Sequence, residues 1–89
     1  MLNDIISIVL SRFDDFGLSS YAVYRGVDFN VCYKTFKVCD DVGRSFGTIV
    51  FYHDYIGYYF NHDMKSVHID YLNLDVDEVV GIFLCYLLY

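Results

Sequence analysis

The stretch TIVFYHDYIGYYFN, residues 48–61, decides the fold of this protein. It is rich in β-branched and aromatic residues, which favour strands, and a turn signal at His53 and Asp54 divides it in two. The sequence therefore predicts the strands Thr48–His53 and Ile56–Asn61. A connection this short joins two strands in the antiparallel sense.

The segments on either side of this hairpin continue the pattern. In Ser66–Leu72, apolar Val67 and Ile69 alternate with polar His68 and Asp70, as expected for a strand with one buried face. Clusters of Gly, Asp, Asn and Ser indicate the loops between strands. They separate two more predicted strands, Tyr21–Arg25 and Phe29–Val38, and they predict loops at residues 26–28, 40–45 and 62–65.

A helix is predicted over Leu2–Phe16, because apolar residues recur there every three or four positions. Asn3 or Asp4 can cap its first turn. Gly17 follows where a left-handed residue commonly ends a helix, and Leu18 comes next to close the turn. The apolar repeat consists of Ile5, Ile6, Val9, Leu10 and Phe13.

A second helix is predicted over Asp75–Tyr89, where Asp75 and Glu78 have the spacing of a capping box. From Val79 onward the segment is almost wholly apolar, and a helix that is apolar all round must be buried all round. One face can cover the sheet, and the other needs the first helix or another chain, with Gly81 permitting a close approach. We therefore expect a homodimer or an obligate partner, with its interface at Phe83, Tyr86 and Leu87.

Together these elements predict one compact α+β domain over residues 1–89, in the order α-β-β-β-β-β-α. The strands form an antiparallel four- or five-stranded meander, flanked by N-terminal and C-terminal helices that cover one face of the sheet. The opposite face is expected to be rich in tyrosine and open to a partner.

The chain carries twelve Asp and Glu against six Lys and Arg, a formal charge of −6. DNA, RNA and anionic membranes attract clustered Lys and Arg, so a basic protein partner is favoured over any of them. The apolar run that begins at Val79 is also shorter than the ~20 residues of a membrane span. Three cysteines without a CxxC motif fit a reducing, cytoplasmic location, the host cytoplasm if the chain is viral.

Three pairs of a histidine with a carboxylate suggest a metal site as an alternative. A strand places His68 and Asp70 on one face, and both side-chain types bind divalent metals. The tight spacings that are typical of zinc and iron sites do not occur, so we expect no metal and no cofactor. The alternative is a metal-binding module or a small metal-dependent enzyme. Its candidate ligands are His53 with Asp54, His62 with Asp63, and His68 with Asp70.

No catalytic signature accompanies the nucleophilic or acidic side chains. None of the cysteines lies in a family motif, and Cys85 falls in the apolar C-terminal segment. Asp14 and Asp15 are adjacent on a helix and therefore do not face each other. Asp40 and Asp41 are typical of a solvated turn. The chain is not expected to be an enzyme.

Protein recognition is the favoured function. Tyrosine rings give large contact areas at low rotamer entropy, and aspartates in the surrounding turns would steer the domain toward a basic partner. Aromatic sheet faces also stack nucleic-acid bases, but the Lys and Arg residues of this chain are scattered, so direct nucleic-acid binding is not expected. The expected partner-binding residues are Asp40, Asp41, Asp54, Asp63, Tyr52, Tyr58 and Tyr59.

A protein that handles nucleic acid is one such basic partner. In size and charge the chain is similar to the small acidic inhibitors, anti-CRISPR-like proteins among them, that phages and other mobile elements direct against host defence complexes. No motif ties it to a particular family. The second alternative is a structural, self-associating viral component.

Overall fold

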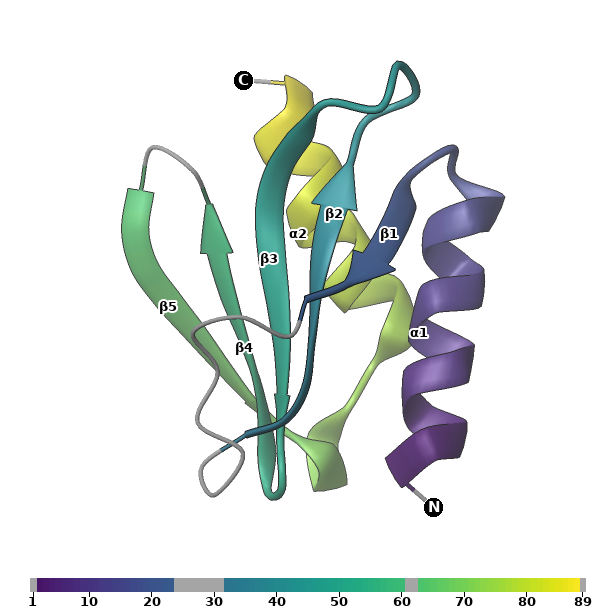
Figure 1. Ribbon diagram of the computed structural model, residues 1–89. Coiled ribbons are helices and arrows are strands. Elements are labelled where there is room, and N and C mark those ends of the chain that lie inside the picture. Colours follow the sequence, from purple (N-terminus) through teal and green to yellow (C-terminus); the bar gives the residue numbers. More distant parts are fainter. Residues whose placement is uncertain (1, 24–31, 61–62, 89) are drawn as a thin grey trace.

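Figure 1 shows the computed structural model of the chain, which describes residues 2–23, 32–60 and 63–88, with side chains over 2–23, 33–60 and 69–85. Within these residues the predicted α+β fold is confirmed. Its elements are the helix α1 (Leu2–Asp15), the strands β1 (Ser19–Ala22), β2 (Cys32–Cys39), β3 (Ser45–Tyr52), β4 (Tyr55–Phe60) and β5 (Asp63–Asp70), a 3-10 turn (Tyr71–Asn73), and the helix α2 (Val76–Leu88).

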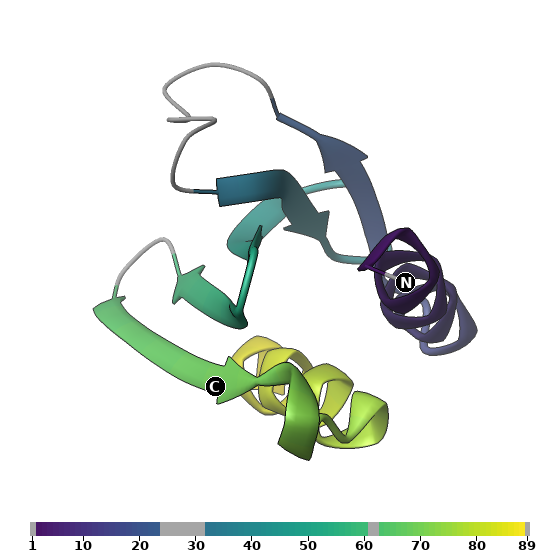
Figure 2. The same ribbon diagram turned by 90° about the horizontal axis from the view of Figure 1, so that it is seen from below.

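The sheet is an open meander in the spatial order β1-β2-β3-β4-β5, with every neighbouring pair antiparallel. Both helices lie on the same side of it, α1 beside β1 and α2 behind the central strands (Figures 1 and 2). The predicted layering, with both helices on one face, is therefore confirmed for the described residues.

The central hairpin forms as predicted, but several strand ends differ. The turn at residues 53–54 is confirmed, and β4 begins at Tyr55, one residue earlier than expected. Phe60 pairs with Asp63, so only two residues separate β4 from β5. Residues 63–65 of the loop predicted over residues 62–65 belong to β5 instead. The strand predicted to reach Leu72 ends at Asp70, and a 3-10 turn follows.

The first two strands differ from their predicted positions. β1 begins earlier in the sequence than predicted, and β2 ends later. β1 begins at Ser19 and β2 ends at Cys39, and these two residues are paired in register. Ser19 has no strong strand preference, so the pairing to β2 decides its conformation. The far ends of both predicted strands, and the turn predicted at residues 26–28, lie outside the described residues.

The end of α1 confirms the predicted C-terminal turn. Gly17 has φ +79°, a left-handed conformation that glycine adopts without a steric cost. The Leu18 amide donates to the Phe13 carbonyl at 2.9 Å, and the Gly17 amide donates to the Asp14 carbonyl at 3.1 Å, which is the Schellman pattern. Leu18 is thereby buried directly below the last turn of the helix.

The start of α2 confirms the Asp75 half of the predicted capping box, whereas Gly81 differs from its prediction. The Asp75 carboxylate accepts hydrogen bonds from the amides of Asp77, at 3.0 Å, and of Glu78, at 3.4 Å. A Cβ at Gly81 would meet no described atom within 4 Å. Gly81 therefore brings no described neighbour into close approach.

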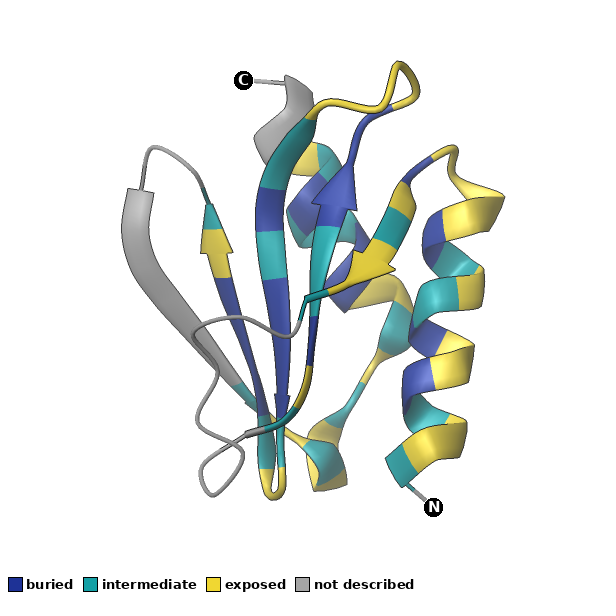
Figure 3. Cartoon of the chain, viewed as in Figure 1, coloured by how far each residue is buried: buried dark blue, intermediate teal, exposed yellow. Residues whose placement is uncertain are grey.

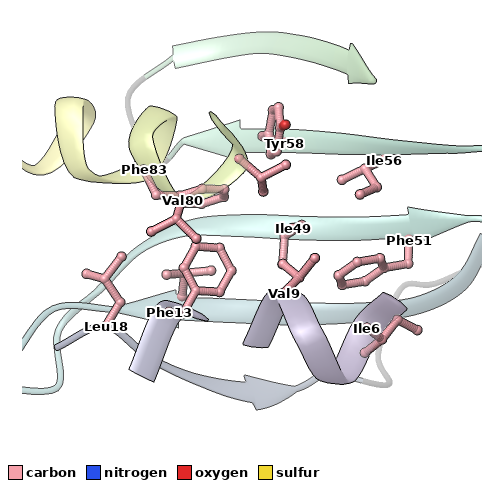
Figure 4. Packing of buried hydrophobic residues seen from close by; sticks show 12 residues of the cluster. Ile6, Val9, Phe13, Leu18, Ile49, Phe51, Ile56, Tyr58, Val80 and Phe83 are labelled. Carbon is pink, nitrogen blue, oxygen red and sulfur yellow. The ribbon is translucent and has the colours of Figure 1, made fainter. Parts of the chain in front are cut away.

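The core lies between the helices and the sheet (Figure 4), and the ring of Phe83 is fully buried in it. The Phe83 ring makes edge contacts with four other rings, at centroid distances of 5.1 to 6.1 Å. Edge-to-face pairs contribute about 0.5–1.5 kcal/mol each beyond the burial of their area. We call these five residues the Phe83 cluster: Phe13 of α1, Phe46 of β3, Tyr58 and Phe60 of β4, and Phe83 of α2.

The position of Phe83 corrects the predicted oligomer interface. Phe83 has no exposed surface, because α1 and three residues of the sheet surround its ring. It is therefore part of the core of its own chain and is not available to a second copy. The side chains of Tyr86 and Leu87, the other two residues of that prediction, lie outside the described residues.

Candidate binding face

Three tyrosines gather on the side of the sheet opposite to the two helices. Along β4, Ile56 and Tyr58 point into the core, so the residues that alternate with them point the other way. Tyr52, Tyr55 and Tyr59 share this second side and are partly exposed there. We call these three residues the tyrosine face.

The three side chains hold one another in place. The rings of Tyr52 and Tyr55 are stacked, with centroids 4.4 Å apart and planes inclined by 20°. The hydroxyls of Tyr52 and Tyr59 form a hydrogen bond of 3.0 Å. Because the turn at residues 53–54 sets the end of β3 beside the start of β4, the stacked pair follows directly from the hairpin. The tyrosine face is therefore ordered before any partner binds.

Gly57 makes room for this arrangement. A Cβ at Gly57 would lie 3.1 Å from Cε2 of Tyr52 and 3.9 Å from Cε2 of Tyr59. A Cβ at this position would push the Tyr52 ring from its place over β4 by a few tenths of an ångström. A glycine inside a strand weakens it and often marks such a close approach.

Tyr71 supports the tyrosine face from the 3-10 turn. Its hydroxyl donates a hydrogen bond of 2.6 Å to the backbone carbonyl of Tyr52. Burial, and secondarily the charge of Asp54, raise the pKa of Tyr71 to about 12. The hydroxyl therefore keeps its proton at neutral pH and remains a donor, which ties residues 71–73 to the end of β3.

Asp40 does not lie in a solvated turn, contrary to prediction, because it closes the β2–β3 loop from inside. It is 6% exposed, and its carboxylate accepts from the amides of Val42 and Arg44 and from Nε of Arg44, at 2.8 to 3.1 Å. The hydrogen bond from the Arg44 amide is the main cause that lowers the pKa of Asp40. With its oxygens used in this way, Asp40 supports the loop and offers little surface to a partner.

The other predicted aspartates lie in different places. Asp41 is exposed in the β2–β3 loop, at the opposite end of the sheet from the exposed Asp54, which precedes Tyr55 (Figure 3). Asp63 starts β5, and its side chain lies outside the described residues. Among the predicted aspartates whose side chains are described, Asp54 is next to the tyrosine face, and Asp40 and Asp41 are not.

Tyr58 is a correction to the predicted binding residues. It has no exposed surface and belongs to the Phe83 cluster, because it occupies an inward position of β4. Its hydroxyl is buried and has no hydrogen-bond partner among the described residues. Burial is the main cause that raises the pKa of Tyr58. It cannot contact a partner while the chain is folded.

The residues of the metal alternative are only partly described. His53 is exposed, and its ring packs against Tyr33 at 5.7 Å between centroids, while the side chains of His62 and His68 lie outside the described residues. In the described part of the chain, no group of three or more His, Cys, Asp and Glu could hold a metal. Cys39, buried, and Cys85, exposed, are both free thiols.

The described arginines are held by carboxylates outside the tyrosine face. Arg12 of α1 binds Asp77 of α2 at 2.6 Å and Asp15 at 3.5 Å, and the hydrogen bond to Asp77 is the main cause that raises its pKa. Arg44 binds Asp40 at 3.0 Å. The exposed pairs of Arg12 contribute little to stability, whereas the pair of Arg44 involves the buried carboxylate of Asp40, and both fix where these cations lie.

Two residues of the candidate site, Tyr55 and Gly57, were not predicted from the sequence. The predicted strand began at Ile56, so it left out Tyr55, and Gly57 was not singled out. The available signal was the spacing of Tyr55, Gly57 and Tyr59, every second residue along one strand. Among the predicted tyrosines, Tyr52 and Tyr59 lie on the face and Tyr58 does not.

In comparisons with known proteins, no family model, no curated protein and no solved structure matches the chain. Its function is therefore argued from its own residues. In the described part of the chain, neither helix has the length and apolar character needed to cross a membrane.

Proposed function

We propose that this protein is a non-catalytic binding module that presents the tyrosine face to a protein partner with a basic surface. The observation that carries the proposal is the mutual ordering of Tyr52, Tyr55 and Tyr59 on the side of the sheet opposite to the helices. Ordered tyrosines lose little conformational entropy on binding and commonly anchor protein interfaces. The formal charge of −6 favours a basic partner.

The specific form of the proposal is an inhibitor. A partner that handles nucleic acid has a basic surface, and an acidic chain of phage or mobile-element origin would block it by occupying that surface. A host defence complex is the partner that we propose to search for first. The support for this form is the size and charge of the chain.

The experiment is affinity capture from a host-cell lysate, followed by titration calorimetry with the purified partner. We expect a partner with a basic surface whose Kd rises at least tenfold with Tyr55→Ser combined with Tyr59→Ser. The control is Phe16→Ser, which removes an exposed aromatic ring at the end of α1, away from the tyrosine face. Circular dichroism establishes that each variant is folded. Equal binding by wild type and the double variant would refute the proposal.

Two further measurements separate the proposal from its alternatives. Binding should weaken as salt rises, because exposed charges are screened over ~8 Å at physiological ionic strength. Light scattering at micromolar concentration tests the self-associating alternative, for which a stable dimer without another partner is the expected result. Metal analysis of the purified protein tests the metal alternative, and stoichiometric metal that is lost with His68→Ala would support it.

A further inference from the structure

One end of the tyrosine face has carboxylates at its margin. Asp70 of β5 is the cross-strand partner of Tyr55, and Asp54 is its neighbour in the turn. Directly opposed residues of an antiparallel pair have Cβ atoms about 4.5–5.5 Å apart, so the side chains of Asp70 and Tyr55 leave the sheet on the same face. Both aspartates are exposed.

At this end of the tyrosine face, the stacked rings of Tyr52 and Tyr55 each have one ring face that does not contact the other ring. Tyr52 and Tyr55 cover each other on one ring face, and their other ring faces point away from the stack. The face of an aromatic ring attracts a cation, and the attraction is stronger where a carboxylate lies nearby. Ring faces together with the exposed Asp54 and Asp70 favour a positively charged group over a neutral or negative one.

We propose that this end of the tyrosine face binds an arginine side chain of the partner protein. The guanidinium would lie flat on the outer face of Tyr55 and donate to Asp54 and Asp70. Arginine fits better than lysine, because its planar group stacks on rings and donates in a fork, whereas an ammonium is a strongly hydrated point charge. The inference rests on the proposed function and specifies the chemistry of its partner.

The same carboxylates count against the other ligand that stacks on tyrosines. A nucleic-acid base would bring its phosphates within the Debye length of Asp54 and Asp70, about 8 Å at physiological ionic strength. The described arginines, Arg12 and Arg44, are held by carboxylates outside this face. A partner that offers arginine meets opposite charge here, and a polyanion meets like charge.

The direct test is an NMR titration of the whole chain with three short peptides that differ at one position, which is arginine, lysine or neutral citrulline. We expect the arginine peptide to shift the ring signals of Tyr52 and Tyr55, with a Kd about three- to fivefold below that of citrulline. Tyr55→Phe should keep the binding and Tyr55→Leu should remove it. Tyr21→Leu is the control, since Tyr21 is exposed on β1, at the other edge of the sheet.

Equal affinity for the arginine and citrulline peptides would overturn the inference, as would stronger shifts from a thymidine hexanucleotide. The captured partner separates this failure from that of the proposed function. If capture depends on Tyr55 and Tyr59 but changes less than twofold with Asp54→Asn combined with Asp70→Asn, the arginine inference is wrong and the binding module stands. If capture does not depend on the tyrosines, the proposed function is wrong as well.

Discussion

The sheet carries an aromatic cluster on each side, and the two clusters differ in burial and in how their rings meet. The Phe83 cluster is wholly or largely buried, and its rings meet edge to face around one central side chain. The tyrosine face is partly exposed, and its rings are stacked and joined through hydroxyls. Strand β4 contributes to both, since Tyr58 points inward and Tyr59 points outward.

The difference shows that the environment decides what an aromatic residue does in this fold. Four phenylalanine rings and the ring of Tyr58 pack inside, where dispersion and burial stabilise the chain. Tyrosines outside keep their hydroxyls in contact with water or with each other, so they cost little to expose and remain available for recognition. We therefore expect the Phe83 cluster to determine stability and the tyrosine face to determine binding.

The largest expected effect is that of Phe83→Ala. Removing the ring leaves a cavity among four aromatic partners and should lower the free energy of unfolding by about 3–5 kcal/mol, measured by urea denaturation. Phe83→Leu is the milder variant, expected to cost about 1.5 kcal/mol, in case the alanine variant does not fold. Tyr55→Ala on the other cluster should cost less than about 1 kcal/mol. Similar losses of unfolding free energy in Phe83→Ala and Tyr55→Ala would show that the two clusters do not differ in their contribution to stability.

The next largest loss of stability is expected at a matched pair of glycines, Gly47 beside the Phe83 cluster and Gly57 beside the tyrosine face. A Cβ at Gly47 would lie 2.9 Å from Cε1 of the buried Phe83, whereas one at Gly57 would lie 3.1 Å from the partly exposed Tyr52. Gly47→Ala should therefore cost about 1–3 kcal/mol, because the Phe83 ring has nowhere to move. Gly57→Ala should cost much less, because the Tyr52 ring can swing toward solvent.

The two glycine variants should also differ in their effect on partner binding. Gly57→Ala should weaken partner capture, since it displaces Tyr52 without removing any tyrosine, and Gly47→Ala should leave the affinity of the folded fraction unchanged. Thermal denaturation and calorimetry on the two variants measure both quantities. Stability loss at Gly57 as large as at Gly47 would show that the tyrosine face is a structural element.

Much of the fold could be predicted because its signals are local. Gly17 ends α1 through its own conformation, Asp75 caps α2 through its own carboxylate, and the turn after Tyr52 is bounded by strand-forming residues. Strand β1 could not be predicted at its true position, because Ser19 gains its conformation from pairing with Cys39. Such pairing depends on residues far along the chain, which local propensity does not contain.

The candidate site was predicted only in part for a related reason. Tyr58 and Tyr59 have the same side chain, and only the register of β4 decides which of them is buried. The pairing of β4 with β3 sets this register: Tyr58 lies opposite Ile49, and both face the core. Asp40 and Asp41 pose the same problem in a loop, since closing the loop turns one carboxylate inward and leaves the other outside.

A smaller effect is expected at the hydrogen bond that supports the tyrosine face. Tyr71→Phe removes the donor to the Tyr52 carbonyl and should cost about 1 kcal/mol at neutral pH. The folded-state pKa of Tyr71 is raised from 10 to about 12, so its stabilising contribution is complete below pH 10 and is lost as the pH rises toward 12. Stability measured between pH 9 and 12 should therefore fall more steeply for wild type than for the variant. Parallel curves would contradict this assignment.

The smallest expected effect has the opposite sign and lies in the Phe83 cluster. The Tyr58 hydroxyl is buried without a hydrogen-bond partner among the described residues, so it loses its hydration on folding and gains nothing described in return. Tyr58→Phe keeps the ring and its edge contact with Phe83, and it should raise the free energy of unfolding by up to about 1 kcal/mol. Tyr59→Phe on the other side of β4 is the control, where loss of an exposed hydroxyl bond should cost about 0.5 kcal/mol. If Tyr58→Phe destabilises the chain instead, the hydroxyl has a bonding partner in water or outside the described residues, and the two clusters are less distinct than their exposure indicates.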